Sequence, residues 1–162
     1  MTRTCTLPGR PESARAAREF TAACLPGCPS VYEAMLCVDE LVANAIQHSR
    51  SGLPGGTIEV RIAVAAGEWL RVEVQDAGPL SSAVPAQRGP LDEGGRGLAL
   101  VVGLADVFGT DGSGLYWAWM PWDSEASRPA PRPPIQIPAQ LRKHVVPCEV
   151  RARGLHHAGG VS

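Results

Sequence analysis

The sequence lacks the features that mark several common classes of protein. Its formal net charge is only −1 at pH 7, so no overall field draws the chain to nucleic acid or to an anionic membrane. No run of residues is long and apolar enough to span a bilayer, and the first residues, MTRTCTLPGRPES, lack the apolar stretch of a signal peptide. We therefore expect a cytoplasmic protein without direct contacts to nucleic acid or membrane.

Cysteine is present, but not in the pattern of a disulfide framework or a metal site. The five cysteines are Cys5, Cys24, Cys28, Cys37 and Cys148. An odd number at irregular spacing does not predict a set of disulfides. A zinc site would need a second closely spaced pair or a paired histidine, and neither is evident. We expect buried, reduced thiols.

The composition changes sharply near residue 122. The chain has 162 residues, of which 44% are hydrophobic and 19% charged, which suits one globular domain. Beyond that point, the stretch SEASRPAPRPPIQIPAQ is rich in proline and has little to bury. The sequence therefore predicts a folded domain over residues 1–122 and a mildly basic, disordered tail over 123–162. Within the tail, AQLRKHVV is a candidate for a short docking helix.

Helical periodicity predicts the first two helices. The first should cover residues 12–25. Its expected buried face is Ala16, Phe20, Ala23 and Cys24. The second should cover 30–48, beginning at Ser30 and Glu33, whose spacing is that of a capping box. Its expected buried stripe is Val31, Met35, Val38, Leu41, Val42 and Ala45.

A third helix is predicted after GGRG at 94–97, over the apolar stretch LALVVGLADVFG. Its expected buried residues are Leu98, Val101, Val102, Ala105 and Val107. Alternating patterns predict strands at residues 3–7, 57–65, 69–75 and 115–121. The second and third of these strands should form an antiparallel hairpin. The aromatic residues of the last strand should be divided between a core side and an exposed side.

Polar residues interrupt the predicted helix over residues 30–48 at a regular interval. Glu40, Asn44 and His48 are four residues apart and so share one edge of the helix. The amide oxygen of Asn44 is a hard ligand of the kind that Mg²⁺ prefers, and Glu40 could orient or deprotonate a nucleophile beside that metal. Asp39 and Gln47 are expected at the surface or in supporting positions. Taken alone, this row could also be a solvated edge.

Two further features suit nucleotide binding. Asp76 follows a predicted strand and could accept a hydrogen bond from an exocyclic amine, with Gly78 letting a base approach the backbone. Gly95 and Gly97 precede a helix, whose free N–H groups can meet phosphate. The irregular segment 77–93 between them could close as a lid. Each motif alone is weak evidence, because such glycines are often plain turns.

Taken in order, three motifs resemble those of a known superfamily. DELVANAIQH, QDAGP and EGGRGLALV are similar to the N, G1 and G2 boxes of the GHKL (Bergerat-type) ATP-binding fold. The likeness covers roughly residues 3–121 and is strongest to the small anti-sigma-factor serine/threonine kinases of actinobacteria. It implies an α+β two-layer sandwich, with a mixed, mostly antiparallel sheet covered on one face by helices. It also implies that the loop between the last two boxes is an ATP lid.

The resemblance also implies roles for individual residues. Glu40 would be the general base, Asn44 the Mg²⁺ ligand and Asp76 the acceptor for the adenine amine. The implied ATP-binding residues are Asn44, His48, Asp76, Gly78, Gly95, Arg96, Gly97 and Leu98. Many relatives carry glycine where this chain has Leu80, and their glycine-and-threonine signature before the last strand is reduced here to residues 112–114.

Two functions follow from the resemblance. The first is an anti-sigma-factor serine/threonine kinase that uses Mg-ATP to phosphorylate an anti-anti-sigma partner, and the presence of Glu40 favours it. The alternative is a non-catalytic module that binds a sigma factor or another regulator, with ATP as a structural or switching ligand. Either protein could be a homodimer.

Overall fold

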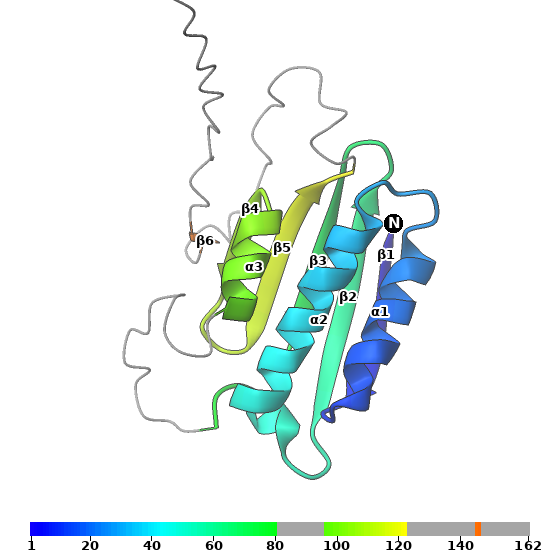
Figure 1. The fold of residues 1–162 in the computed structure, drawn as a ribbon. Helices are drawn as coiled ribbons and strands as arrows, with labels where there is room; N and C mark the ends of the chain where they lie inside the picture. The colour runs from blue at the N-terminus through cyan, green and yellow to red at the C-terminus, as the bar shows by residue number, and fades with distance from the viewer. Residues whose placement is uncertain (81–95, 123–144, 147–162) are drawn as a thin grey trace, which may run out of the picture.

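One layer of helices covers one face of an antiparallel sheet (Figure 1). The computed structural model describes residues 1–80, 96–122 and 145–146. The strands are β1 (Thr2–Pro8), β2 (Thr57–Ala65), β3 (Trp69–Gln75), β4 (Val107–Thr110), β5 (Leu115–Pro121) and β6 (Val145–Val146). Their order across the sheet is β1-β2-β3-β5-β4-β6. The predicted α+β two-layer fold is confirmed, although every described strand pair is antiparallel and the sheet is not mixed.

The described residues form three α-helices and one short 3₁₀ helix. These are α1 (Glu12–Cys24), α2 (Val31–His48), η1 (Arg50–Gly52) and α3 (Arg96–Leu104). The predicted hairpin is confirmed, with β2 and β3 pairing from Glu59 opposite Gln75 to Ala65 opposite Trp69. No helix of the described ranges is long and apolar enough to cross a membrane.

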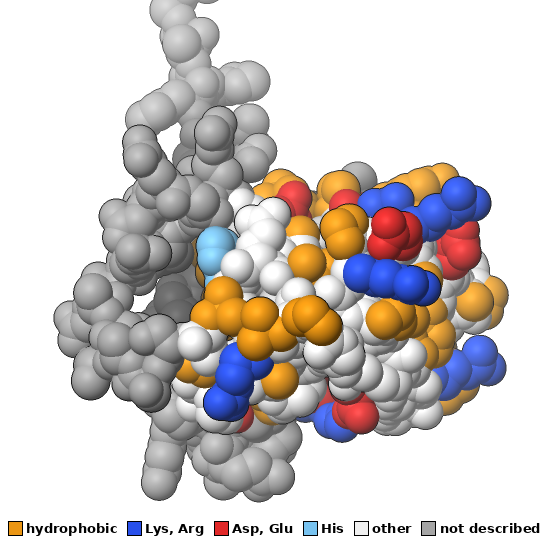
Figure 2. All heavy atoms as spheres, turned by 90° about the horizontal axis from the view of Figure 1, so that it is seen from below, with side chains coloured by type: hydrophobic (Ala, Val, Ile, Leu, Met, Phe, Trp, Pro, Cys, Tyr) orange, Lys and Arg blue, Asp and Glu red, His pale blue; other side chains and the backbone are white. Residues whose placement is uncertain are grey.

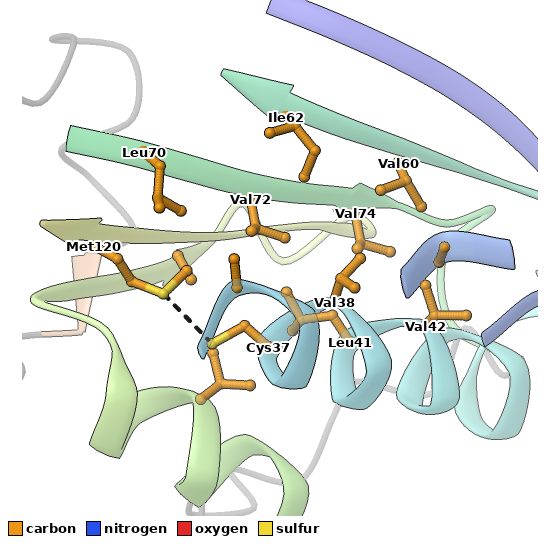
Figure 3. Packing of buried hydrophobic residues seen from close by; sticks show 14 of the residues in the cluster. Cys37, Val38, Leu41, Val42, Val60, Ile62, Leu70, Val72, Val74 and Met120 are labelled. Atoms are coloured by element: carbon orange, nitrogen blue, oxygen red, sulfur yellow. Dashed lines mark hydrogen bonds between the residues drawn. The ribbon is translucent and has the colours of Figure 1, made fainter. Parts of the chain in front are cut away.

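The core is formed where α2 packs on the sheet. Figure 3 shows its buried side chains facing those of β2 and β3. The buried residues of α2 are Ala34, Cys37, Val38, Leu41, Val42 and Ala45. Four of the six predicted stripe residues are therefore confirmed, whereas Val31 and Met35 are only half-buried. Burying one such valine or leucine stabilises the fold by roughly 1.5–3 kcal/mol.

The predicted capping box at the start of α2 is wrong. The helix begins at Val31 as expected, but the side chain of Ser30 makes no capping hydrogen bond. Ser30 is instead buried, and its backbone N–H donates to the carbonyl of Trp122 at 3.3 Å. This bond ties the start of α2 to the end of β5, so tertiary contact decides the geometry of this helix end.

The buried face of α1 agrees with the prediction only in part, because Cys24 is buried and Phe20 packs against the core, whereas the other predicted residues are not buried. Its buried residues are Ser13, Ala17, Thr21 and Cys24, whereas Ala23 is exposed. Two of these are polar, and each hydroxyl donates to a backbone carbonyl: Ser13 to Pro8 at 2.5 Å and Thr21 to Ala17 at 2.8 Å. Because these hydroxyls are satisfied locally, they can be buried at little free-energy cost.

The third predicted helix is too long. It ends at Leu104, and Val107–Thr110 is a strand instead. The N–H of Asp106 donates to the carbonyl of Trp119 at 2.8 Å, which starts the pairing with β5. Gly109 is required there, because a Cβ at this position would lie 2.4 Å from the Trp117 ring. A short apolar run does not distinguish a strand from a helix by periodicity.

The described cysteines are reduced, and three of the four are buried, as predicted. Cys24, Cys28 and Cys37 are buried and Cys5 is half-buried, while Cys148 lies outside the described residues. Burial raises the pKa of the Cys37 thiol to about 12, with smaller contributions from the charges of Glu33 and Glu40. The thiol therefore stays protonated at neutral pH.

The tail lies mostly outside the described residues. Its described part is β6, which pairs antiparallel with β4, Gly109 lying opposite Val145. The end of the predicted docking helix, over residues 145–146, is thus a strand. The domain boundary at residue 122 stays a prediction.

We expect Leu41→Ala to lower the free energy of unfolding by about 2–5 kcal/mol, because Leu41 is fully buried under the sheet. Leu36→Ala is the matched control on the same helix, since Leu36 is 46% exposed, and its effect should stay below about 1 kcal/mol. Urea unfolding of both variants checks this. Equal losses would contradict the packing described for α2.

Candidate functional site

The polar row of α2 faces the start of α3. A small cavity of about 60 Å³ lies between the two helices. It is lined by Glu40, Ala43, Asn44, Gln47, His48, Gly97 and Leu98. The structure therefore brings together the row of polar residues and the glycine-to-helix segment, which are about fifty residues apart in the sequence. Gln47 also belongs to this lining and is exposed, as expected of a surface position, and His48 is exposed at the row's end.

Glu40 lies against the first turn of α3. A Cβ at Gly97 would lie 2.2 Å from Oε2 of Glu40, so this close approach depends on glycine. The positive end of the helix dipole favours a negative group at this place. A carboxylate that can accept a proton is thus adjacent to a helix terminus of the kind that binds phosphate.

Asp76 forms a tight turn at the end of β3. Its Oδ1 accepts a hydrogen bond from the N–H of Gly78 at 2.6 Å, and its own N–H donates to the carbonyl of Gly114 at 2.9 Å. Gly78 has a φ of 80°, which glycine adopts without strain. Burial raises the pKa of Asp76, and the charge of Asp111 adds to this, whereas the Gly78 hydrogen bond and Arg50 oppose it.

The residues after α2 hold this turn in place. Arg50 donates from Nε and Nη2 to the carbonyl of Ala77, at 2.9 and 2.6 Å, and from its backbone N–H to the carbonyl of Gly78 at 2.9 Å. The hydroxyl of Ser51 accepts from the N–H of Ala77 at 2.9 Å and donates to the carbonyl of Thr57 at 2.6 Å. The end of α2 and the Asp76 turn therefore form one hydrogen-bonded unit.

Tyr116 links the two halves of the site. Its phenol is hydrogen-bonded to the side chains of Asn44 and Thr110. Burial raises its pKa and the nearby charge of Asp76 adds to this, while the bonds to Asn44 and Thr110 oppose it. Tyr116 comes from β5, where it lies opposite Val74 of β3. It therefore contacts the candidate metal ligand and lies near enough to the candidate base-binding turn to feel the charge of Asp76.

The loop between β4 and β5 closes the site beside Asp76. Although partial burial alone would raise the pKa of Asp111, hydrogen bonds from Ser113, Leu115 and Gly114 hold it below the usual value. These bonds shape the turn that presents Gly114. A Cβ there would lie 2.5 Å from Oδ1 and 2.8 Å from the carbonyl oxygen of Asp76, and its φ is 124°.

The predicted site residues can now be placed. Glu40, Asn44, His48, Gly97 and Leu98 line the cavity. Asp76 and Gly78 form the adjoining turn, and Arg96 is the first residue of α3. Gly95 and residues 81–93 of the predicted lid lie outside the described residues.

Asp39 has a supporting role, as predicted. It lies beside the row on α2 and accepts a hydrogen bond from Arg18 of α1 at 2.6 Å. Three positions that shape the site were missed, namely Arg50, Ser51 and Tyr116. Arg50 and Ser51 belong to a polar Ser-Arg-Ser stretch directly after α2, which could have drawn attention to them. No sequence pattern, however, indicates that this stretch contacts residue 77.

A larger hollow of about 470 Å³ lies between the end of β1 and the loop before β2, and the described residues that line it do not line the cavity. Glycine and proline make up most of its lining, and Arg10 is its one charged residue. Figure 2 views the molecule from below and shows uncharged atoms over most of this end of the molecule. Although this hollow is larger, its lining offers fewer groups that could bind or react than the lining of the smaller cavity.

The donors at the cavity fit a magnesium ion. Asn44 offers an amide oxygen and Glu40 a carboxylate, while the described residues contain no cluster of three or more histidine, cysteine or acidic groups. Mg²⁺ commonly takes only one or two protein oxygens and completes its shell with water and nucleotide phosphates. Asn44 would hold such an ion.

Comparison with known proteins agrees with this geometry. Residues 7–116 match the family model described as histidine kinase-like ATPase domain. The matched range runs from β1 to Tyr116 and so contains the polar row, the Asp76 turn and α3. No curated protein matches the chain.

We expect Gly114→Ala to destabilise the Asp76 turn and to lower nucleotide affinity at least about tenfold, a loss of about 1.4 kcal/mol in binding free energy. The added methyl group would collide with Asp76. Gly112→Ala is the matched control in the same loop, because its φ is also positive but its Cβ would meet nothing within 4 Å. The Gly112→Ala variant should lose only about 1–2 kcal/mol of stability from backbone strain, and it should bind nucleotide as tightly as the natural chain. Calorimetric titration and urea unfolding measure both, and equal affinities would contradict the assignment.

We expect Asp76→Asn to raise the free energy of unfolding at neutral pH while weakening nucleotide binding. The pKa of Asp76 is raised in the folded chain, so the ionised carboxylate destabilises the fold above that pKa. The gain should shrink as the pH falls through the folded pKa and vanish below the ordinary value near 3.8.

Asp111→Asn is the control with the opposite sign. Its folded pKa is lowered, so the variant should lose stability at neutral pH, and this loss should fade as the pH falls through that pKa. Urea unfolding across a pH series tests both. If both variants changed the free energy of unfolding at neutral pH in the same direction, the opposite pKa shifts described for Asp76 and Asp111 would be wrong.

Proposed function

The chain belongs to the family of histidine kinase-like ATPase domains, and we propose that it is an ATP-binding regulator that acts as a serine/threonine kinase on an anti-anti-sigma protein. The single observation that carries the catalytic part is the position of Glu40. It stands one helical turn before Asn44, and its carboxylate lies against Gly97 at the start of α3. A potential base, a metal ligand and a phosphate-binding helix end therefore meet at one point.

The residues divide the chemistry among them. Asp76 accepts a hydrogen bond from the adenine amine, and the free N–H groups at the start of α3 meet phosphate. Glu40 accepts the proton of the substrate serine while the hydroxyl oxygen of that serine attacks the γ-phosphorus. The bond from this phosphorus to the β–γ bridging oxygen then breaks, and ADP is released. Mg²⁺, held at Asn44, would offset phosphate charge. Such transfer depends mostly on positioning and on charge stabilisation.

A second function rests on a different observation. Leu80, at the end of the Asp76 turn, is 52% exposed, and it stands where many relatives carry glycine. These features favour a module that binds a sigma factor or another regulator, in which nucleotide is a structural or switching ligand. For both functions we propose that the protein is cytoplasmic. We also propose that it forms a homodimer.

The deciding experiment compares four proteins: the natural chain, Asn44→Ala, Glu40→Gln and the control Glu33→Gln, which changes a glutamate near the start of the same helix. We expect the natural chain and both glutamine variants to bind Mg-ATP in the micromolar range by calorimetry. Asn44→Ala should bind at least about tenfold more weakly, since it removes the metal's amide oxygen.

Phosphotransfer then separates the two functions. Transfer of the γ-phosphoryl group to a serine of an anti-anti-sigma protein should fall at least about a hundredfold in Glu40→Gln, within the range of a lost general base, and stay unchanged in Glu33→Gln. Nucleotide binding without transfer by the natural chain would favour the binding module. A natural chain that binds no nucleotide would contradict both functions.

A further inference from the structure

Strand β1 forms one edge of the sheet, and its outer side is unpaired within the described part of the chain. Among the described strands β1 pairs with β2 alone. The pairing runs without a bulge over all seven residues of β1. An edge strand of this length presents a row of free N–H and C=O groups, which is a template for pairing with another strand.

The hydrogen bonds to β2 show which residues of β1 turn their backbone outward. Met1 exchanges two bonds with Val64: its terminal ammonium donates to the carbonyl of Val64, and its own carbonyl accepts from the N–H of Val64, both at 2.8 Å. Beyond the other end of β1, the N–H of Gly9 donates to the carbonyl of Gly56 at 2.9 Å. In an antiparallel pair, residues bonded to the partner alternate with residues whose backbone groups point away from it. The outward N–H and C=O groups therefore belong to Thr2, Thr4 and Thr6.

These three threonines suit antiparallel pairing of β1 with β1 of a second copy. They are exposed and evenly spaced about Thr4, so a twofold axis at Thr4 would place Thr2 opposite the partner's Thr6. Three residue pairs of this kind exchange about six hydrogen bonds, and threonine pairs across strands are favourable. The same register places Arg3 opposite the partner's Cys5, so that no like charges face each other.

An apolar side of α1 lies above the same edge. In Figure 1 α1 is the outermost helix over β1, with α2 on its other side. Arg18 points toward α2, where its guanidinium donates to Asp39 at 2.6 Å. Successive residues are about 100° apart around a helix. With Arg18 turned to α2 and the buried face turned to the sheet, the remaining side of α1 faces the free edge. That side carries Ala16, Phe20 and Ala23.

This side of α1 is most of the apolar face that helical periodicity predicts as buried, yet one copy of the chain covers it only partly. Ala16 and Phe20 are half-buried and Ala23 is exposed. A twofold axis perpendicular to the sheet keeps the helices of both copies on the same face of the joined sheet. The two α1 helices would then lie side by side and cover these residues. The backbone groups of β1 and the apolar side of α1 therefore fit the same occupant.

We propose that the chain forms a twofold dimer in which two β1 strands pair antiparallel about Thr4 and the two α1 helices pack through the apolar row around Phe20. The joined sheet satisfies the outward backbone groups of both edges, and an isologous contact closes the assembly at two copies. This interface belongs to the homodimer proposed above. Because no described residue of β1 or α1 lines the nucleotide cavity, a failure of this inference is distinguishable from a failure of the proposed chemistry.

The first measurement is the mass of the full chain in solution by sedimentation equilibrium, with and without Thr4→Pro. Proline removes the outward N–H at the twofold axis, and an edge strand tolerates it where the N–H does not bond to the neighbouring strand. The dissociation constant of the dimer should rise at least about tenfold, a loss of about 1.4 kcal/mol. Thr4→Val is the matched control, since valine keeps the N–H and the preference for strands. Its dimer should be as stable as that of the natural chain.

A second pair of variants tests the contact between the α1 helices. Ala23→Glu would place a carboxylate between them and should also weaken the dimer at least about tenfold. Tyr32→Glu is the control, because it adds the same charge to α2 at a side chain that is 74% exposed. It should leave the dimer unchanged. Since Ala23 is exposed in one copy of the chain, we expect both variants to fold.

NMR of a mixture of differently labelled chains tests the register. Opposite residues that do not exchange hydrogen bonds lie closest across an antiparallel pair, so we expect Overhauser effects between the Hα atoms of Arg3 and the partner's Cys5. A natural chain that is monomeric at the concentration of the NMR sample would overturn the proposal. A dimer that folded Thr4→Pro leaves unchanged, or Overhauser effects from β1 to another segment, would also overturn it. Should Thr4→Pro fail to fold, Ala23→Glu and the Overhauser effects decide.

Discussion

The burial of one stripe of α2 against β2 and β3 is the constraint on which the rest of the structure depends. Once Leu41 and Ala45 face the sheet, the rotation of the helix is fixed, and the residues immediately before them, Glu40 and Asn44, must lie on the edge toward α3. The apolar stripe thus places the polar row, and the row in turn requires glycine at position 97. Core packing and site geometry are consequences of one helix orientation.

The sequence predicted the elements whose pattern is strong and failed where several packings fit the same pattern. The β2–β3 hairpin alternates clearly over both strands, so its bounds followed directly. In α1, alanines surround the helix and give little contrast between faces, and the satisfied hydroxyls of Ser13 and Thr21 decided which face is buried. The run Val107–Thr110 reads equally well as the end of a helix, and only its pairing with β5 makes it a strand.

The candidate site was predictable where motifs carry it and hidden where backbone groups do. Glu40, Asn44, Asp76 and Gly97 stand in recognisable stretches. By contrast, Arg50 and Ser51 act on the carbonyls and N–H of residues around position 77, and a backbone acceptor leaves no trace in the sequence. Contacts of this kind depend on which loops the fold brings together, which local patterns do not encode.

The buried thiols have a practical consequence. Oxidants and alkylating reagents attack the thiolate, and a pKa of about 12 leaves Cys37 almost entirely protonated at neutral pH. Its sulfur is also enclosed in the core, 3.9 Å from that of Met120. Cys37 therefore does not react while the domain is folded, and it becomes reactive only when α2 separates from the sheet. The rate at which a thiol reagent modifies Cys37 thus measures how often the core opens.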